Sequence, residues 1–135
     1  MDKQGGNDGP EEIIKGKILV IDDEADLRAA FIAVLSGEGF SVVAAADGRE
    51  GIRKNIEYDP DVIILDLKMP VLGGVETLKE IRKTDKKVWV IILTAYGAAG
   101  SVRETDELDV FEYASKPFRN AVIIASVKDA LSDAR

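Results

Sequence analysis

The stretch Val62-Ile63-Ile64-Leu65-Asp66-Leu67-Lys68-Met69-Pro70 decides the fold class of this chain. It opens with four consecutive aliphatic residues, three of them β-branched, which is typical of a strand buried on both faces in a parallel sheet. The run ends in a carboxylate, Asp66. Ligands and catalytic groups of open parallel sheets lie beyond the carboxyl ends of the strands, so Asp66 occupies a position where chemistry is expected. Taken alone, it is explained equally well as an ordinary turn-forming Asp.

The composition excludes several classes of function. The 135 residues are 46% hydrophobic and 32% charged, as in one soluble globular domain and unlike a membrane protein. A formal net charge of −7 argues against direct binding of nucleic acid, which needs clustered Lys and Arg. With no Cys and no His, the chain lacks disulfides, thiolate nucleophiles, Ser-His-Asp catalysis and the usual zinc and copper ligands. Any bound metal would therefore be held by oxygen atoms.

The amino-terminal residues have the composition of a tail. Residues 1–12 contain neither the apolar core of an export signal nor a basic amphipathic helix. We therefore predict a flexible tail over residues 1–14, a folded domain over residues 15–135, and a cytoplasmic location without membrane insertion.

Apolar runs and helical patterns alternate along the rest of the chain. Strands are predicted over residues 17–21, 40–45, 62–66, 88–93 and 110–114, and helices around residues 27–35, 47–58, 75–81, 98–108 and 120–130. The helix over 98–108 has a weak pattern, since Val102 and Leu108 are its only large apolar residues. Strict alternation implies an α/β fold with a parallel sheet covered on both sides through right-handed crossovers.

Polar residues follow four of the five predicted strands. They are Asp22 and Asp23 after the first strand, Asp66 after the third, Thr94 after the fourth and Lys116 after the fifth. These residues should converge at one edge of the sheet. Clustered carboxylates repel one another unless a cation neutralises them, and Mg²⁺ is the cation that fits an all-oxygen site. A lysine and a hydroxyl beside such a metal suit a transferring phosphoryl group, so Asp66 is predicted to be a nucleophile that forms an aspartyl-phosphate.

Each of these signals is weak when it is taken alone. The acids at 22–24 could simply favour the amino terminus of the following helix, and Lys116 could be a solvated lysine in a turn. The prediction rests on the combination.

The same residues carry a family resemblance. Asp22-Asp23, Asp66, Thr94 and Lys116-Pro117, in this order and with strands between them, resemble the receiver domain of two-component response regulators. The resemblance covers roughly residues 15–131. It implies a flavodoxin-like (βα)5 fold, with a five-stranded parallel sheet in the order 2-1-3-4-5 and helices on both faces. It also implies that a histidine kinase or a phosphotransfer protein donates a phosphoryl group, and that phosphorylation changes the surface formed by the fourth helix, the fifth strand and the fifth helix.

The resemblance further implies a metal site. Mg²⁺ would be bound directly by Asp23 and Asp66, through water by Asp22, and by the backbone carbonyl of Lys68. The side chain of Lys68, two residues beyond Asp66, would also tune the lifetime of the phosphoryl group, as would Tyr96, two residues beyond Thr94. The alternative for both is an ordinary exposed side chain.

Three further residues take roles from the resemblance. Thr94 would follow the phosphoryl group inward, and Lys116 would pair with it and precede a cis bond to Pro117. Tyr113 matches an aromatic switch position, although a partly buried core tyrosine would look the same in the sequence. Asp109 departs from the family, which commonly has Gly at this position.

Two other functions remain open on the sequence alone. A phosphohydrolase with an aspartate nucleophile needs a second acid two residues after that nucleophile, and Asp66 is followed there by Lys68, although Asp22 is followed by Glu24. A docking module that acts without phosphorylation is the other alternative. The favoured interpretation is a receiver that catalyses only its own phosphorylation and autodephosphorylation and acts on an unknown downstream protein.

A partner surface is also predicted. The helix over 120–130 carries apolar residues beyond its inward stripe, Val122 and Ile124 among them. We expect part of this surface to be exposed and to serve a protein target or homodimerisation through the fourth helix, the fifth strand and the fifth helix.

Overall fold

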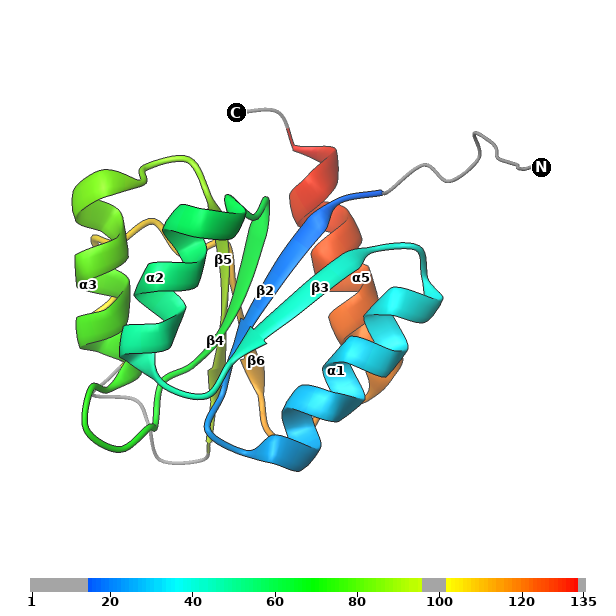
Figure 1. Ribbon diagram of the computed structural model, residues 1–135, viewed down its shortest axis with the longest axis horizontal. Coiled ribbons are helices and arrows are strands. Elements are labelled where there is room, and N and C mark those ends of the chain that lie inside the picture. Colours follow the sequence, from blue (N-terminus) through cyan, green and yellow to red (C-terminus); the bar gives the residue numbers. More distant parts are fainter. Residues whose placement is uncertain (1–14, 96–101, 134–135) are drawn as a thin grey trace.

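Five parallel strands form the centre of the molecule (Figure 1). The structure is a computed structural model, and it describes residues 15–95 and 102–133. The elements in chain order are β2 (Lys17–Ile21), α1 (Ala25–Gly37), β3 (Ser41–Ala45), α2 (Gly48–Tyr58), β4 (Val62–Asp66), α3 (Gly74–Thr84), β5 (Trp89–Thr94), β6 (Glu112–Ser115) and α5 (Asn120–Ser132). The sheet order is β3-β2-β4-β5-β6, which is 2-1-3-4-5 counted along the chain. The predicted α/β, flavodoxin-like topology is confirmed.

Alternate residues of the strands face opposite sides of the sheet and so build two cores. Ile18 and Val20 of β2 pack in the core shared with α1 and α5, whereas Leu19 and Ile21 pack in the core shared with α2 and α3. The two helical layers lie on opposite faces of the sheet (Figure 1). Burial of each of these aliphatic side chains contributes about 1.5–3 kcal/mol.

The strand that ends in Asp66 is the middle strand of the sheet. β4 pairs with β2 on one side and with β5 on the other, and all five of its residues are buried. Its unbroken apolar run is explained by this position, since helices cover both faces and neighbouring strands both edges. Asp66 is thereby placed at the carboxyl end of the central, fully buried strand.

The segment before β6 differs from the prediction. Residues 98–101 of the predicted fourth helix lie outside the described residues, and residues 102–103 are helical. From residue 104 the predicted helix is wrong, because the amides of Thr105, Asp106 and Leu108 bond to carbonyls three residues back, as in tight turns. The polar run offers no apolar face that could pack a longer α-helix. The fifth strand is also shorter and later than predicted, beginning at Glu112 rather than residue 110.

The chain enters β6 through a left-handed residue. Asp109 has a φ of 58°, a conformation that favours Gly and that Asp and Asn reach more easily than other residues. Asp109 therefore adopts a left-handed conformation here without a glycine. The buried Arg82 of α3 stabilises this turn by donating hydrogen bonds to the carbonyls of Leu108 and Asp109 at 2.8 Å each.

Among the residues described, no helix combines the length and the hydropathy that a membrane span requires.

Candidate functional site

Asp22 is held from several sides at the carboxyl end of β2. Its amide donates to Ala45 O of β3 at 3.1 Å, and Arg28 of α1 donates to its carbonyl at 2.9 Å. Its carboxylate Oδ1 accepts the amide of Glu24 at 2.9 Å. Asp22 has no exposed surface, so its carboxylate cannot turn to bulk water. A buried charge of this kind requires a charged or hydrogen-bonding partner.

Asp66 ends the neighbouring strand β4 and is 4% exposed. Its Oδ1 accepts the amide of Lys68 at 3.1 Å, so the loop after β4 turns back over the carboxylate. Gly74 permits this turn, because a Cβ at that position would lie 2.5 Å from the carbonyl oxygen of Asp66. Any larger residue at position 74 would push the loop away from Asp66.

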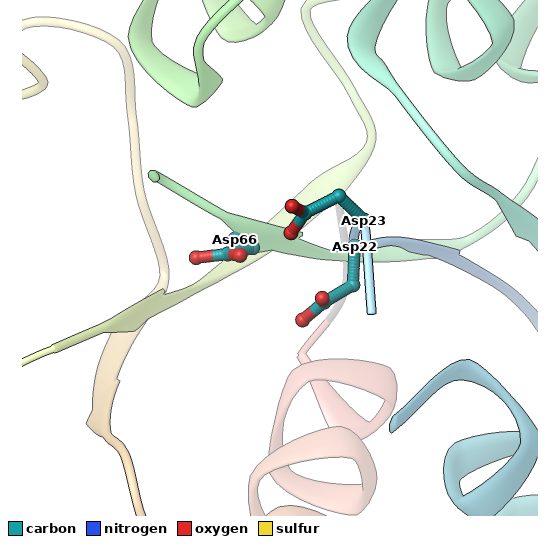
Figure 2. Close-up of side chains that lie close together, drawn as sticks. All are labelled: Asp22, Asp23 and Asp66. Atoms are coloured by element: carbon teal, nitrogen blue, oxygen red, sulfur yellow. The ribbon is translucent and has the colours of Figure 1, made fainter. Parts of the chain in front are cut away.

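Asp22, Asp23 and Asp66 form one cluster of carboxylates. Each offers an oxygen, and these oxygens lie within 4.8 Å of one another (Figure 2). Asp22 and Asp66 are buried, whereas Asp23 is exposed at the rim. The cluster thus consists of two buried carboxylates and one that faces solvent.

Lys116 brings a positive charge into the cluster. Its Nζ lies 3.2 Å from Asp22 Oδ2 and 3.3 Å from Asp66 Oδ2. The lysine is positioned by its own backbone, whose amide donates to Thr94 O at 2.8 Å. The following Lys116–Pro117 peptide bond is cis.

The pKa values of the cluster are shifted in directions that follow from its packing. Burial raises the pKa of Asp66 and the Asp22 charge adds to the rise, while the Lys68 amide and Lys116 oppose it. Burial alone would lower the pKa of Lys116, but the carboxylates of Asp66 and Asp22 outweigh it and raise that pKa. One ammonium therefore pairs with two of the three carboxylates in the cluster.

This donor set fits Mg²⁺. All three side chains offer carboxylate oxygens, the ligands that hard divalent cations prefer, and the chain has no His or Cys to recruit a softer metal. Burial is the main reason that the pKa of Asp66 is raised, and a divalent cation would offset the smaller contribution of the Asp22 charge.

Residues 18–128 match the family model of the response regulator receiver domain. The chain belongs to this family. Sporulation initiation phosphotransferase F of Bacillus subtilis (strain 168) is 34% identical over 115 residues, which cover 85% of this chain and 90% of that protein. Transcriptional regulatory protein PrrA of Mycobacterium tuberculosis (strain ATCC 25618 / H37Rv) is 37% identical, and the match covers 85% of this chain but only 49% of PrrA. The chain thus spans about half the length of PrrA.

A solved receiver domain has the same fold. The response regulator receiver domain protein from Clostridium thermocellum superposes with a TM-score of 0.81 and 35% identity, covering 86% of this chain and 94% of that one. The chain is accordingly a phosphoacceptor receiver domain of a two-component system, and the phosphohydrolase alternative is not favoured. Receiver domains are signalling modules that interact with histidine kinases or phosphotransfer proteins and bind Mg²⁺ at an acidic pocket.

The remaining predicted site residues lie in and around this edge of the receiver domain. Thr94 is the half-buried last residue of β5 and pairs in register with Ser115 of β6. The Lys68 side chain is exposed at the rim. Tyr113 of β6 is 38% exposed, and its hydroxyl lies 2.6 Å from Thr105 Oγ1. Tyr96 lies outside the described residues.

Two residues that support the site, Arg28 and Thr105, were not predicted from the sequence. Arg28, which holds the Asp22 carbonyl, carries no motif that separates it from other helix-surface arginines. Thr105 is fully buried and its hydroxyl contacts that of Tyr113, although it stands in the polar run that weakened the predicted fourth helix. The one sequence feature that could have indicated Thr105 is its position eight residues before Tyr113, the aromatic switch position.

Proposed function

We propose that Asp66 is the residue that accepts the phosphoryl group. One observation supports this most directly: Asp66 is the carboxylate that lies at the end of the central strand, beside both the Lys116 ammonium and the Lys68 amide. A carboxylate oxygen of Asp66 attacks the phosphorus, a new P–O bond forms, and the bond between phosphorus and the donor's leaving group breaks. With a phosphohistidine donor, the departing imidazole nitrogen keeps the electron pair of the broken P–N bond.

Asp22, Asp23, Asp66 and the backbone carbonyl of Lys68 would hold Mg²⁺ in this reaction. The ion would neutralise the charge that accumulates on the carboxylates and on the phosphoryl oxygens. Asp22 contributes a fixed charge, since its carboxylate is already oriented by the Glu24 amide and Lys116. Asp23 is the exposed member of the set and the one that a metal reaches first.

Lys116 and Thr94 would serve the phosphorylated state. The Lys116 ammonium is already beside Asp66 Oδ2 and needs little movement to pair with a phosphoryl oxygen on that carboxylate. Thr94 ends the strand next to β4, which puts a hydroxyl on the same edge of the sheet. Donors that meet the equatorial phosphoryl oxygens in this way stabilise transferred phosphate.

The switch would work through the aromatic ring of Tyr113. In this structure the ring is partly exposed and its hydroxyl contacts Thr105. Movement of the Thr94 hydroxyl toward phosphate vacates space toward which the ring of Tyr113 can move. Phosphate can shift this equilibrium only through its different affinity for the two arrangements, so the contact with Thr94 must supply much of the bias.

The surface that changes would be the one around β6 and α5. A depression of about 430 Å³ is lined there by Tyr113, Phe118 and Val122, and Val122 is 39% exposed. Ile124 packs against the core instead. We propose this surface, together with the neighbouring turns over residues 104–108, as the contact for a downstream protein or for a second copy of the chain. A Val122→Glu variant that stays folded should lose target binding or phosphorylation-induced self-association in sedimentation experiments.

The phosphodonor would approach the carboxyl edge of the sheet from the side of α1, away from the surface proposed for the downstream protein. A cavity of about 450 Å³ lies between α1 and the start of α5, with Leu27, Phe31 and Phe118 among its lining residues and Lys116 at its border. A histidine kinase or phosphotransfer protein seated there would bring its phosphohistidine to Asp66. Autophosphorylation from small donors, autodephosphorylation and the cytoplasmic location remain predictions.

A small acyl phosphate tests the proposal, because the required side chains all belong to this chain. Incubation with the donor and Mg²⁺ should add one phosphoryl group in intact-mass measurements, and omission of Mg²⁺ should abolish the addition. Asp66→Asn should remain unlabelled, while the exposed-acid control Asp26→Asn should label as the wild type does. Equal labelling of the Asp66→Asn protein would show that another residue is the acceptor.

A further inference from the structure

A second cavity lies at the edge of the sheet opposite the carboxylate cluster. It has a volume of about 790 Å³, and its lining includes Asp61 and Trp89, which stand at the amino ends of β4 and β5, together with the last turns of α2 and α5. The strand β4 separates the two sites, so Asp61 and Asp66 are five residues apart, roughly 16 Å along the strand. A volume of this size is in the range of ligand-binding cavities.

Part of the cavity wall is apolar and open to solvent. Trp89 is half-buried, and Ile56 of α2 is 68% exposed. An isoleucine this exposed, in the lining of the same cavity as a tryptophan, favours an apolar group in the bound ligand.

The charged part of the wall is mostly acidic. Four Asp side chains face one Lys in the lining. Two of the acids are engaged by the fold: Asp85 accepts the amides of Lys87 and Val88, and Asp61 accepts the amide of Lys17. The carboxylates of the other two, Asp59 and Asp133, form no hydrogen bond or ion pair with the described part of the chain.

The wall also contains a buried side chain whose oxygen accepts no hydrogen bond from any residue that the structure describes. Asn55 is 4% exposed and donates its amide to Asp85 Oδ2 at 3.1 Å. Its Oδ1 has no partner among the residues described. An unmatched buried carbonyl oxygen is destabilising, and an N–H group brought by a ligand that reaches it would satisfy it.

The cation that fits this wall is not a metal ion. Within residues 15–95 and 102–133, the only group of three or more acids close enough to hold a metal is Asp22, Asp23 and Asp66. The acids of the cavity are therefore too far apart for one small ion, and they suit an extended cation with its own N–H donors.

From these features we infer that the cavity binds a short basic and apolar segment of a partner protein, in which an arginine or lysine side chain stands beside an aliphatic one. The cation faces Asp59 and Asp133, and the aliphatic group packs on Ile56 and Trp89. This contact is independent of the proposed phosphorylation of Asp66, which lies at the other edge of the sheet.

Trp89 provides a direct readout because it is the single tryptophan of the chain. The probe is a blocked pentapeptide that alternates leucine and arginine, titrated into the full chain at low salt. We expect a saturable change in tryptophan emission, at least about three-fold weaker binding to Asp59→Asn/Asp133→Asn, and weaker binding to Ile56→Ala. Asparagine also tolerates the left-handed backbone of Asp59, whose φ is 53°, so the double variant should stay folded.

The matched control is Glu104→Gln/Asp106→Asn, which removes the same charge from exposed residues elsewhere. Undiminished binding to this control supports the cavity, whereas equal weakening of both double variants would show attraction by net charge only and overturn the inference. A glutamate-for-arginine version of the peptide should not bind. Equally tight binding of arginine amide would also overturn the inference, because the site would then be one for a small amine. Asp66→Asn should bind the peptide normally, which separates this test from that of the phosphoacceptor.

Discussion

The ammonium nitrogen of Lys116 lies 3.3 Å from Asp66 Oδ2, within a cluster that holds two other carboxylates. The lysine is 19% exposed and Asp66 only 6% by side chain, so neither charge is screened as a surface pair would be. Lys116 also lies 3.2 Å from Asp22 Oδ2, and the carboxylates of Asp66 and Asp22 together raise the pKa of Lys116 despite its burial.

Lys116→Met should therefore destabilise the metal-free protein. Without the ammonium, Asp22 and Asp66 repel each other unopposed, and the free energy of unfolding at neutral pH should fall by about 1–3 kcal/mol. Urea denaturation in EDTA measures this loss, and saturating Mg²⁺ should recover more stability in the variant than in the wild type. Lys128→Met removes an exposed ion pair with Glu38 and should change stability by less than about 1 kcal/mol. Equal stability of Lys116→Met and the wild type in EDTA would contradict the role given to this pair.

Asp23→Asn should separate metal binding from folding. Asp23 is the exposed acid of the cluster, so its replacement should leave stability in EDTA unchanged or slightly raised through reduced repulsion. Mg²⁺ at about 100 times its dissociation constant should stabilise the wild type by about 2.7 kcal/mol, whereas the variant should gain much less at the same concentration. Thermal unfolding with and without Mg²⁺ provides the measurement. Asp26→Asn, also exposed and near the cluster in sequence, serves as the control and should respond to Mg²⁺ like the wild type.

Thr105 and Tyr113 should be energetically coupled. The Thr105 hydroxyl donates to Val102 O at 2.6 Å, which leaves its oxygen to accept the Tyr113 hydroxyl at 2.6 Å. Thr105→Val and Tyr113→Phe each break this bond, so the double variant should lose about 0.5–1.5 kcal/mol less than the sum of the single losses. Urea titrations of the four proteins close the cycle. If the stability losses of the two single variants simply add up in the double variant, the hydrogen bond between the two hydroxyls does not stabilise this position of the Tyr113 ring.

The features of the receiver domain that could be predicted from the sequence are those that follow its repeating pattern of strands and helices. Asp22, Asp66 and Lys116 could be placed together because each follows a predicted strand, and parallel strands bring their carboxyl ends to one edge. Thr105 could not be placed, because its burial depends on a turn that the helical pattern over 98–108 did not indicate. The contacts of Arg82 with Leu108 and Asp109 were equally invisible, since side-chain hydrogen bonds to distant carbonyls leave no periodicity in the sequence.

Asp85 lies at the far edge of the sheet and organises the connection between α3 and β5. Its Oδ1 accepts the amides of Lys87 and Val88 at 3.0 Å each, and its Oδ2 accepts the Asn55 amide at 3.1 Å. Burial favours the neutral acid and is the largest single influence on its pKa. The hydrogen bonds from Val88, Lys87 and Asn55 and the charge of Arg82 together outweigh burial, so the pKa of Asp85 lies below its ordinary value of 3.8.

Asp85→Ala should consequently cost stability in a pH-dependent way. A carboxylate whose pKa is lower in the folded state stabilises fully above its unfolded value of 3.8, and this contribution is lost as the pH falls through the folded pKa. At neutral pH the variant should be less stable by about 1–3 kcal/mol, because three donors lose their acceptor. The difference in free energy of unfolding between variant and wild type should stay constant down to about pH 4 and shrink below it. Urea denaturation at several pH values measures this difference, with the exposed Asp106→Ala as the control that should show none. A difference that grows as the pH falls would reverse the sign of the inferred shift and exclude this account of Asp85.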